Sequence, residues 1–219
     1  MFDLHFEIIW EYAPYFLSGT VYTIEISAAA IVFGTLLGLF LALTRLYGKR
    51  WCALPASCFV EMIRGTPLLL QLFIVYFGVI PLFVNKPDGL LAAAAALSIN
   101  AGAYISETFR AGIQAVPREQ SEAAHSLGLS WKQSMRYVIL PQAVRNVLPP
   151  LGNSFVSLIK DSSLASVIAA PELMYWANAA NAQYYRVWET FITTGCIYFA
   201  LTFVTNRLLG RLERKFSYN

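Results

Sequence analysis

EAAHSLGLSWKQSMRYVILP, residues Glu122 to Pro141, is a polar and helix-prone stretch that lies between two hydrophobic segments. Of the 219 residues in the chain, 57% are hydrophobic and only 13% are charged, and the mean hydropathy is +0.53. A soluble domain carries about a quarter charged residues. This shortfall, together with apolar runs near the twenty or so residues that a spanning helix needs, indicates an integral membrane protein.

Five hydrophobic segments predict spanning helices, and the chain is therefore expected to be an all-α integral membrane protein with a single domain, residues 1–219. The first contains Gly34 and Gly38, a GxxxG spacing that permits close contact between helices. The fourth is interrupted by Pro141 and by the run from Pro149 to Gly152. The predicted segments cover about residues 15–43, 54–83, 90–113, 135–168 and 187–209.

Basic residues predict the orientation, because Lys and Arg concentrate in cytoplasmic loops. If the N-terminus is outside, only Lys86, Lys160 and Arg186 of the sixteen Lys and Arg residues fall on the outer side. The C-terminus is then cytoplasmic, and so is the loop at about residues 115–134, between the third and fourth helices. The opening stretch therefore starts in the cytoplasm.

Local signals predict two short helical pieces in this loop. Ser121 can cap a helix that begins with Glu122, Ala123 and Ala124. Gly128 offers a break, and Ser130 can then cap a second helix that continues into the membrane. On physical grounds alone, an ordinary solvated loop helix remains the alternative, and no partner is named.

The same stretch resembles the EAA loop of permease subunits of binding-protein-dependent ABC importers. The matching positions are Glu122, Ala123, Ala124, Gly128, Val138, Leu140 and Pro141, with Val138 where the family usually has Ile. Other stretches resemble the polar amino acid uptake branch of that family, and together they cover nearly the whole chain. They are IRGTPLLLQLF from Ile63, ETFRAGIQAV from Glu107, LPQAVRNVLPPLGNSF from Leu140 and LIKDSSLASVI from Leu158.

The resemblance implies a permease subunit that imports a polar amino acid across the bacterial cytoplasmic (inner) membrane. It implies that Glu122, Ala123, Ala124 and Gly128 belong to a coupling helix, which docks on a cytoplasmic ABC ATPase dimer. The other implied partners are a second permease, identical or similar, and an extracytoplasmic amino-acid-binding protein. Membrane lipid is expected around the helices, and no nucleic acid partner is expected.

The chain lacks the signature of a nucleotide-binding engine. A P-loop ends in Gly-Lys-Ser/Thr at a helix N-terminus, whereas Gly48-Lys49 is followed by Arg50. We therefore expect no enzyme activity and no cofactor in this chain, with ATP and Mg²⁺ held by the partner ATPase. The three cysteines, Cys52, Cys58 and Cys196, have no metal-ligand spacing and are expected to be small packing residues.

Polar residues inside a bilayer are costly and indicate functional sites. The interrupted fourth helix is expected to expose backbone groups that suit the carboxylate and ammonium of an amino acid. Lys160 is a candidate partner for the carboxylate, with an interfacial position as its alternative. On the third helix, Asn100 and Tyr104 are four residues apart and share a face, and a contact between helices is their alternative. The candidate substrate residues are Asn100, Tyr104, Asn153, Ser154, Ser157, Lys160 and Asp161.

Lys160 next to Asp161 argues against a net-negative site, so we expect glutamine, glutamate or cystine-like cargo in preference to arginine or lysine. Two other classes of protein remain as alternatives. A secondary transporter or channel is one, although no internal repeat is visible. A membrane hydrolase is the other, although only His5 and His125 are available and Gly152-Asn153-Ser154-Phe155 lacks the glycine of a nucleophile elbow.

Overall fold

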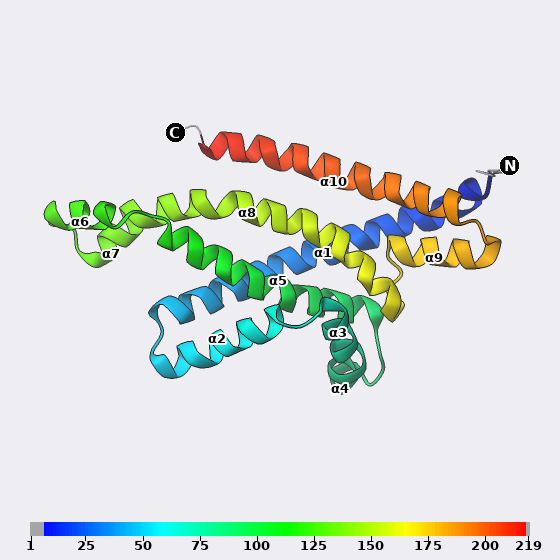
Figure 1. The fold of residues 1–219 in the computed structure, drawn as a ribbon, viewed down its shortest axis with the longest axis horizontal. Coiled ribbons are helices and arrows are strands. Elements are labelled where there is room, and N and C mark those ends of the chain that lie inside the picture. The colour runs from blue at the N-terminus through cyan, green and yellow to red at the C-terminus, as the bar shows by residue number, and fades with distance from the viewer. Residues whose placement is uncertain (1–6, 218–219) are drawn as a thin grey trace.

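The computed structural model describes residues 7–217, and within them it contains helices and no strand. Long helices run side by side, with short helices at both ends of the assembly (Figure 1). The α-helices are α1 (Glu7–Tyr47), α2 (Arg50–Arg64), α3 (Leu68–Phe73), α4 (Ile80–Val84), α5 (Gly89–Gln114), α6 (Arg118–Ser126), α7 (Trp131–Ser134), α8 (Leu140–Asp161), α9 (Leu173–Tyr184) and α10 (Val187–Ser217). Two π-helical segments, η1 (Ile74–Val79) and η2 (Met135–Ile139), and one 3₁₀ segment, η3 (Ser162–Ile168), complete them.

The prediction of an all-helical membrane protein is confirmed. Among the described residues, α1, α5 and residues 187–212 of α10 are long and apolar enough to cross a membrane. A fourth crossing is added if α2 and the segment Leu68–Val84 count together as one bent span. Large apolar side chains cover the outer faces of α1 and α10, including Phe33, Phe40 and Phe199.

The second predicted helix is not continuous. The chain bends by 108° between α2 and the segment that starts at Leu68. Three features of Gly65, Thr66 and Pro67 explain the bend. Gly65 is the C-cap of α2, proline has no N–H to continue a helix, and the residue before a proline avoids the helical region.

The break predicted in the fourth helix lies elsewhere. α8 runs unbroken through Pro149, Pro150 and Gly152. Each proline removes one backbone hydrogen bond, but its fixed φ is compatible with a helix, and α8 is held by packing of the buried Ala143 and Val147. The regular helix ends instead at Asp161, where η3 begins.

Close packing of α1 against α5 forms the centre of the fold. A Cβ atom on Gly34 would lie 2.8 Å from the Cβ of Ala101, and one on Gly38 would lie 2.9 Å from the carbonyl oxygen of Gly102. A Cβ on Gly102 would in turn lie 2.8 Å from Cδ2 of Leu37. The GxxxG prediction is thus confirmed, and small residues on both helices permit the approach.

A buried carboxylate holds α9 at the end of the molecule where α1 begins and α10 begins (Figure 1). Glu172, fully buried, accepts hydrogen bonds from the backbone N–H groups of Met174 and Tyr175 and from the hydroxyl of Tyr198 on α10. Burial raises the pKa of this carboxyl group to about 7. The Leu173 N–H donates to Thr23 Oγ1 on α1 at 3.2 Å. Glu172 therefore caps α9 and ties it to its neighbours.

The cysteines do not match their prediction. All three are exposed, where small packing residues were expected. Cys196 lies at an apolar groove between α10, α1 and α8.

The α1–α5 contact predicts the effect of one methyl group. Gly38→Ala should lower the thermal unfolding midpoint of the detergent-solubilised protein, because overpacking a close contact costs about 1–3 kcal/mol. Gly195→Ala on α10 is the matched control, because a Cβ there has no atom within 4 Å. Its unfolding midpoint should stay or rise, since alanine is the better helix former. Equal midpoints for the two variants would contradict this description of the core.

Candidate substrate cavity and coupling segment

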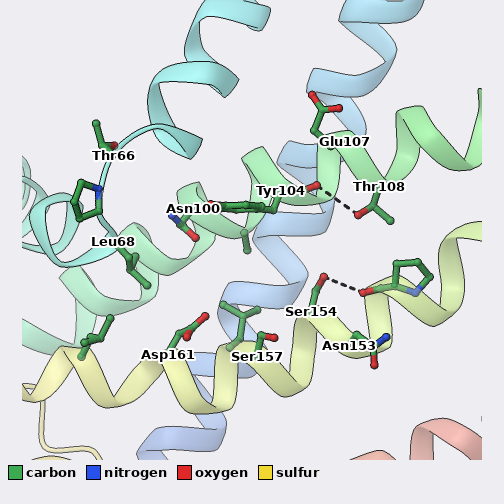
Figure 2. Close-up of a pocket in the computed structure, with 15 residues that line it drawn as sticks. Thr66, Leu68, Asn100, Tyr104, Glu107, Thr108, Asn153, Ser154, Ser157 and Asp161 are labelled. Carbon is green, nitrogen blue, oxygen red and sulfur yellow. Dashed lines mark hydrogen bonds between the residues drawn. The ribbon is translucent and has the colours of Figure 1, made fainter.

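A cavity of about 820 Å³ lies between α5, α8 and the bend that joins α2 to α3. Small-molecule sites in proteins occupy about 300–1,000 Å³. Figure 2 shows side chains of α5 and α8 on facing sides of this space, with Thr66 contributed by the bend. Its lining is Thr66, Pro67, Leu68, Asn100, Ala101, Tyr104, Glu107, Thr108, Pro150, Asn153, Ser154, Ser157, Leu158, Asp161 and Leu164.

Six of the seven candidate substrate residues line this one cavity. Asn100 and Tyr104 come from α5, and the remaining four come from α8. Positions three to four apart on a helix share a face, so the spacing from Asn153 through Ser157 to Asp161 explains why α8 presents them together. The members are Asn100, Tyr104, Asn153, Ser154, Ser157 and Asp161.

Lys160 is the exception, since it is exposed and does not line the cavity. Consecutive residues of an α-helix point about 100° apart. The face that carries Asp161 into the cavity therefore turns Lys160 away from it. Lys160 therefore makes no ion pair with Asp161, and it acts on that carboxylate only through the electrostatic attraction of its charge.

Three polar residues of the lining were not predicted as substrate residues. Thr66 lies in the bend, and Thr108 and Glu107 follow Tyr104 on α5. The helical spacing from Asn100 through Tyr104 to Thr108 was available in the sequence. Thr66 depends on a bend that only the fold reveals.

Glu107 is the centre of an ion-pair cluster at one end of the cavity. Its carboxylate lies 2.7 Å from Arg45 of α1, 2.7 Å from Arg110 of α5 and 3.5 Å from Arg64 of α2. The guanidinium of Arg64 also lies over the ring of Tyr104, 5.5 Å from its centroid. Arg64 thus pairs across helices, and within the described chain no ion pair joins it to Glu61. The Glu107 carboxylate is neutralised by these arginines and is not free for a ligand.

Asp161 is in the opposite situation. Within residues 7–217 its carboxylate has no ion pair and no hydrogen bond from another side chain. Figure 2 shows it directed from α8 toward α5. An unpaired carboxylate at a cavity wall suits a cationic group, because charge-assisted hydrogen bonds are the strong ones.

The remaining lining provides both donors and acceptors. Asn100 and Asn153 each carry a carbonyl oxygen and an NH₂ group, and hydroxyls add groups that do either. Ser154 donates its own hydroxyl proton to the Pro150 carbonyl at 2.9 Å, which leaves its oxygen as an acceptor. Groups of these kinds are complementary to the ammonium and carboxylate of a small zwitterion.

The segment between α5 and α8 has the predicted break. Gly128 has φ +82°, a value that side chains with a Cβ rarely adopt. The Leu129 N–H bonds to the Ala124 carbonyl at 3.1 Å and the Gly128 N–H to the His125 carbonyl at 2.9 Å. These two bonds form a Schellman motif, which ends α6 and reverses the chain.

Of the two predicted N-caps in this segment, only Ser130 is confirmed. Ser130 is the N-cap of α7, and its backbone N–H bonds to Gln133 Oε1 at 2.9 Å, as in a capping box. The predicted cap Ser121 lies inside α6 instead, because that helix already begins at Arg118 after Pro117. Glu122 and Ala123 are exposed, whereas Ala124 is buried.

The described residues contain no group of three His, Cys, Asp or Glu side chains that could hold a metal ion. The polar side chains that line the cavity carry amide, hydroxyl and carboxylate groups.

Relatives with known names match the chain along its whole length. It is 38% identical over 221 residues to the probable amino-acid ABC transporter permease YckA of Bacillus subtilis, covering 96% of this chain and 97% of the relative. It is 36% identical to the arginine transport permease ArtQ of the same organism, covering 99% of both chains. It is also 36% identical to the glutamine transport permease GlnP of Escherichia coli, covering 94% and 95%.

Solved structures agree with these relatives. A crystal structure of an amino acid ABC transporter with histidines superimposes with a TM-score of 0.91 at 40% identity, covering 98% of this chain and all of the other. The MetNI methionine ABC transporter shares the fold, with a TM-score of 0.81 at 18% identity over 94% and 98% of the two chains. The model of the family called binding-protein-dependent transport system inner membrane component matches residues 34–218. The chain therefore belongs to this family of bacterial inner-membrane transport components.

Proposed function

We propose that this chain is the permease subunit of an ABC importer that carries a polar amino acid across the bacterial inner membrane. The observation that carries the proposal is the cavity between α5 and α8, which combines one unpaired carboxylate with neutral donors and acceptors. Membership of the family removes the support for a membrane hydrolase, a channel or a secondary transporter.

The proposed topology has five crossings, with the N-terminus outside and the C-terminus in the cytoplasm. The bent pair of α2 and Leu68–Val84 would form the second crossing. η2 with α8 would form the fourth, although α8 is not among the described helices that are long and apolar enough to cross by themselves. The Glu107 cluster supports the orientation, because it brings Arg45, Arg64 and Arg110 to one end of the bundle. Basic residues at one end are what a cytoplasmic side predicts.

The amino acid is proposed to bind between the facing walls of the cavity. Asp161 accepts hydrogen bonds from the α-ammonium, and the side chains of Asn153 and Ser157 donate to the α-carboxylate. Glu107 cannot serve a second cationic group, because three arginines already surround it. A neutral polar side chain such as that of glutamine therefore fits better than a guanidinium, and the charge of Lys160 outside the cavity partly offsets that of Asp161.

The engine is proposed to be a separate ATPase dimer that holds ATP and Mg²⁺. α6 and the turn after it would dock on it, since Glu122, Ala123 and Leu127 are exposed at the end of the molecule. A second permease, identical or similar, would complete the pathway, because one coupling segment per chain suits a two-fold assembly. At the opposite end, α9 offers a platform for an extracytoplasmic binding protein.

The pocket assignment predicts the effect of one charge. In the purified permease–ATPase complex, Asp161→Asn should weaken binding of labelled L-glutamine at least about tenfold, because a charge-assisted bond is lost. Asp88→Asn makes the same chemical change at the N-cap of α5, outside the cavity, where asparagine caps equally well. It should leave the affinity unchanged.

Competition with unlabelled L-glutamine, L-arginine and L-cystine in the same assay ranks these amino acids by affinity. Glutamine or cystine should displace the labelled L-glutamine more strongly than arginine does. Equal affinities in Asp161→Asn and the unmutated complex would refute the pocket, and preferential binding of arginine would refute only the side-chain preference.

The coupling assignment predicts a different defect. Gly128→Val should leave binding intact but abolish the stimulation of ATP hydrolysis by loaded binding protein, because valine at φ +82° costs more than 1 kcal/mol and reshapes the turn. Glu122→Lys should act similarly, because it reverses an exposed charge on the part of α6 that is proposed to dock on the ATPase. Gly210→Val is the control, since its Cβ meets open space at an ordinary helical φ. Full stimulation in both coupling variants would rule out this role for α6.

A further inference from the structure

We propose that Gln71 is a positioning residue for the substrate cavity: its amide fixes the orientation of Asn100, so that Asn100 turns its oxygen Oδ1 toward the ammonium of the bound amino acid. The inference rests on the proposed function, because it takes the cavity to hold an amino acid. Gln71 itself does not line the cavity.

Gln71 is buried, with 7% of its surface exposed, one turn after the bend between α2 and α3. Its Nε2 atom lies 2.7 Å from the Ile63 carbonyl oxygen, 3.1 Å from the Thr66 carbonyl oxygen and 3.0 Å from Thr66 Oγ1. Carbonyl oxygens only accept hydrogen bonds. The side of the Gln71 amide that faces the bend must therefore be its NH₂ group.

The other side of the amide is then fixed as an acceptor, and Asn100 responds to it. Asn100 Nδ2 donates to Gln71 Oε1 at 3.0 Å. If Asn100 were flipped, two acceptor oxygens would face each other and this bond would be lost. The chain of constraints thus runs from two backbone carbonyls through Gln71 to the amide of Asn100.

The consequence for the cavity is a defined polarity. One Nδ2 hydrogen of Asn100 is committed to Gln71, so the amide cannot flip and Oδ1 keeps its direction. Within residues 7–217 the structure gives Oδ1 no partner. Figure 2 shows the Asn100 oxygen on the side that faces α8 and its nitrogen on the side of Thr66. Oδ1 and the Asp161 carboxylate are therefore two acceptors on facing walls, which suits an ammonium with its three donors.

The alternative is that Gln71 only stabilises the bend between α2 and α3 and has no effect on recognition. The two roles predict different results. In the purified permease–ATPase complex, the affinities of labelled L-glutamine and of its α-deamino analogue are measured, and the same pair of measurements is made for L-arginine. For each pair, the ratio of the affinity of the amino acid to that of its analogue reports recognition of the ammonium. This ratio does not depend on the amount of folded protein.

Gln71→Met keeps the volume and removes both hydrogen-bonding functions. We expect it to lower the ratio about tenfold, the loss expected for one hydrogen bond to a charged group. Asn100→Ala should lower the ratio by a similar factor, and the double variant should be no worse than Asn100→Ala alone, because Gln71 acts through Asn100. Additive losses in the double variant, or an unchanged ratio in Gln71→Met, would overturn the proposal.

Two further variants complete the test. Thr23→Val removes a buried hydrogen bond between α1 and the start of α9, outside the cavity, and should leave the ratio unchanged. Gln71→Glu, if protonated by its buried position, can still donate to the Ile63 carbonyl and accept from Asn100, so it should retain most of the ratio. If Gln71→Met yields no folded complex, a ratio in Gln71→Glu as low as in Asn100→Ala would overturn the proposal.

Failure of the underlying function gives a different pattern. If neither Asn100→Ala nor Asp161→Asn changes the ratio, then the cavity does not recognise the ammonium and the proposed site is wrong. If those two variants lower the ratio and Gln71→Met does not, then the site stands and only the role of Gln71 is wrong.

Discussion

The close approach of α1 and α5 is the constraint on which the rest of the structure depends. Gly34 and Gly38 on one helix and Gly102 on the other bring the two backbones together with no room for an added Cβ. α5 thereby becomes a fixed central element that is buried along much of its length. One turn of it then supplies Asn100 and Tyr104 to the cavity, and a later turn supplies Glu107 to the ion-pair cluster.

The two carboxylates of the cavity have different partners, and this difference determines what each can do. Glu107 shares its charge with arginines from three helices and so holds the ends of α1, α2 and α5 together. Asp161 has no such partner among the described residues. An unpaired charge at the wall of a protein cavity is costly, and a ligand that brings an ammonium would satisfy it.

Much of this was predictable from sequence, and the predictable parts share a physical cause. Long apolar runs, the GxxxG spacing and the EAA stretch are local patterns that need no knowledge of the fold. Helical spacing likewise placed Asn100 and Tyr104 on one face. Gly128 was predicted because a positive φ at a helix end favours glycine.

The parts that were missed depend on direction in space. The sequence placed Lys160 beside Asp161, but a helix turns adjacent side chains apart. The sequence predicts a break at Pro149 and Pro150, because it does not reveal the packing that keeps α8 continuous. Gln71 looked like one polar residue in an apolar run, and its importance appears only when the chain bends at Thr66 and brings it to Asn100.

Protection of a cysteine by substrate tests the central claim, that the amino acid lies between α5 and α8. Ser157→Cys, inside the cavity, and Lys160→Cys, one turn away and outside it, are placed in complexes whose three exposed native cysteines are serine. The rate at which a small charged thiol reagent modifies each is measured with and without saturating amino acid. The account predicts that substrate slows modification at position 157 several-fold and leaves position 160 unchanged. Equal rates at position 157 with and without substrate would contradict it.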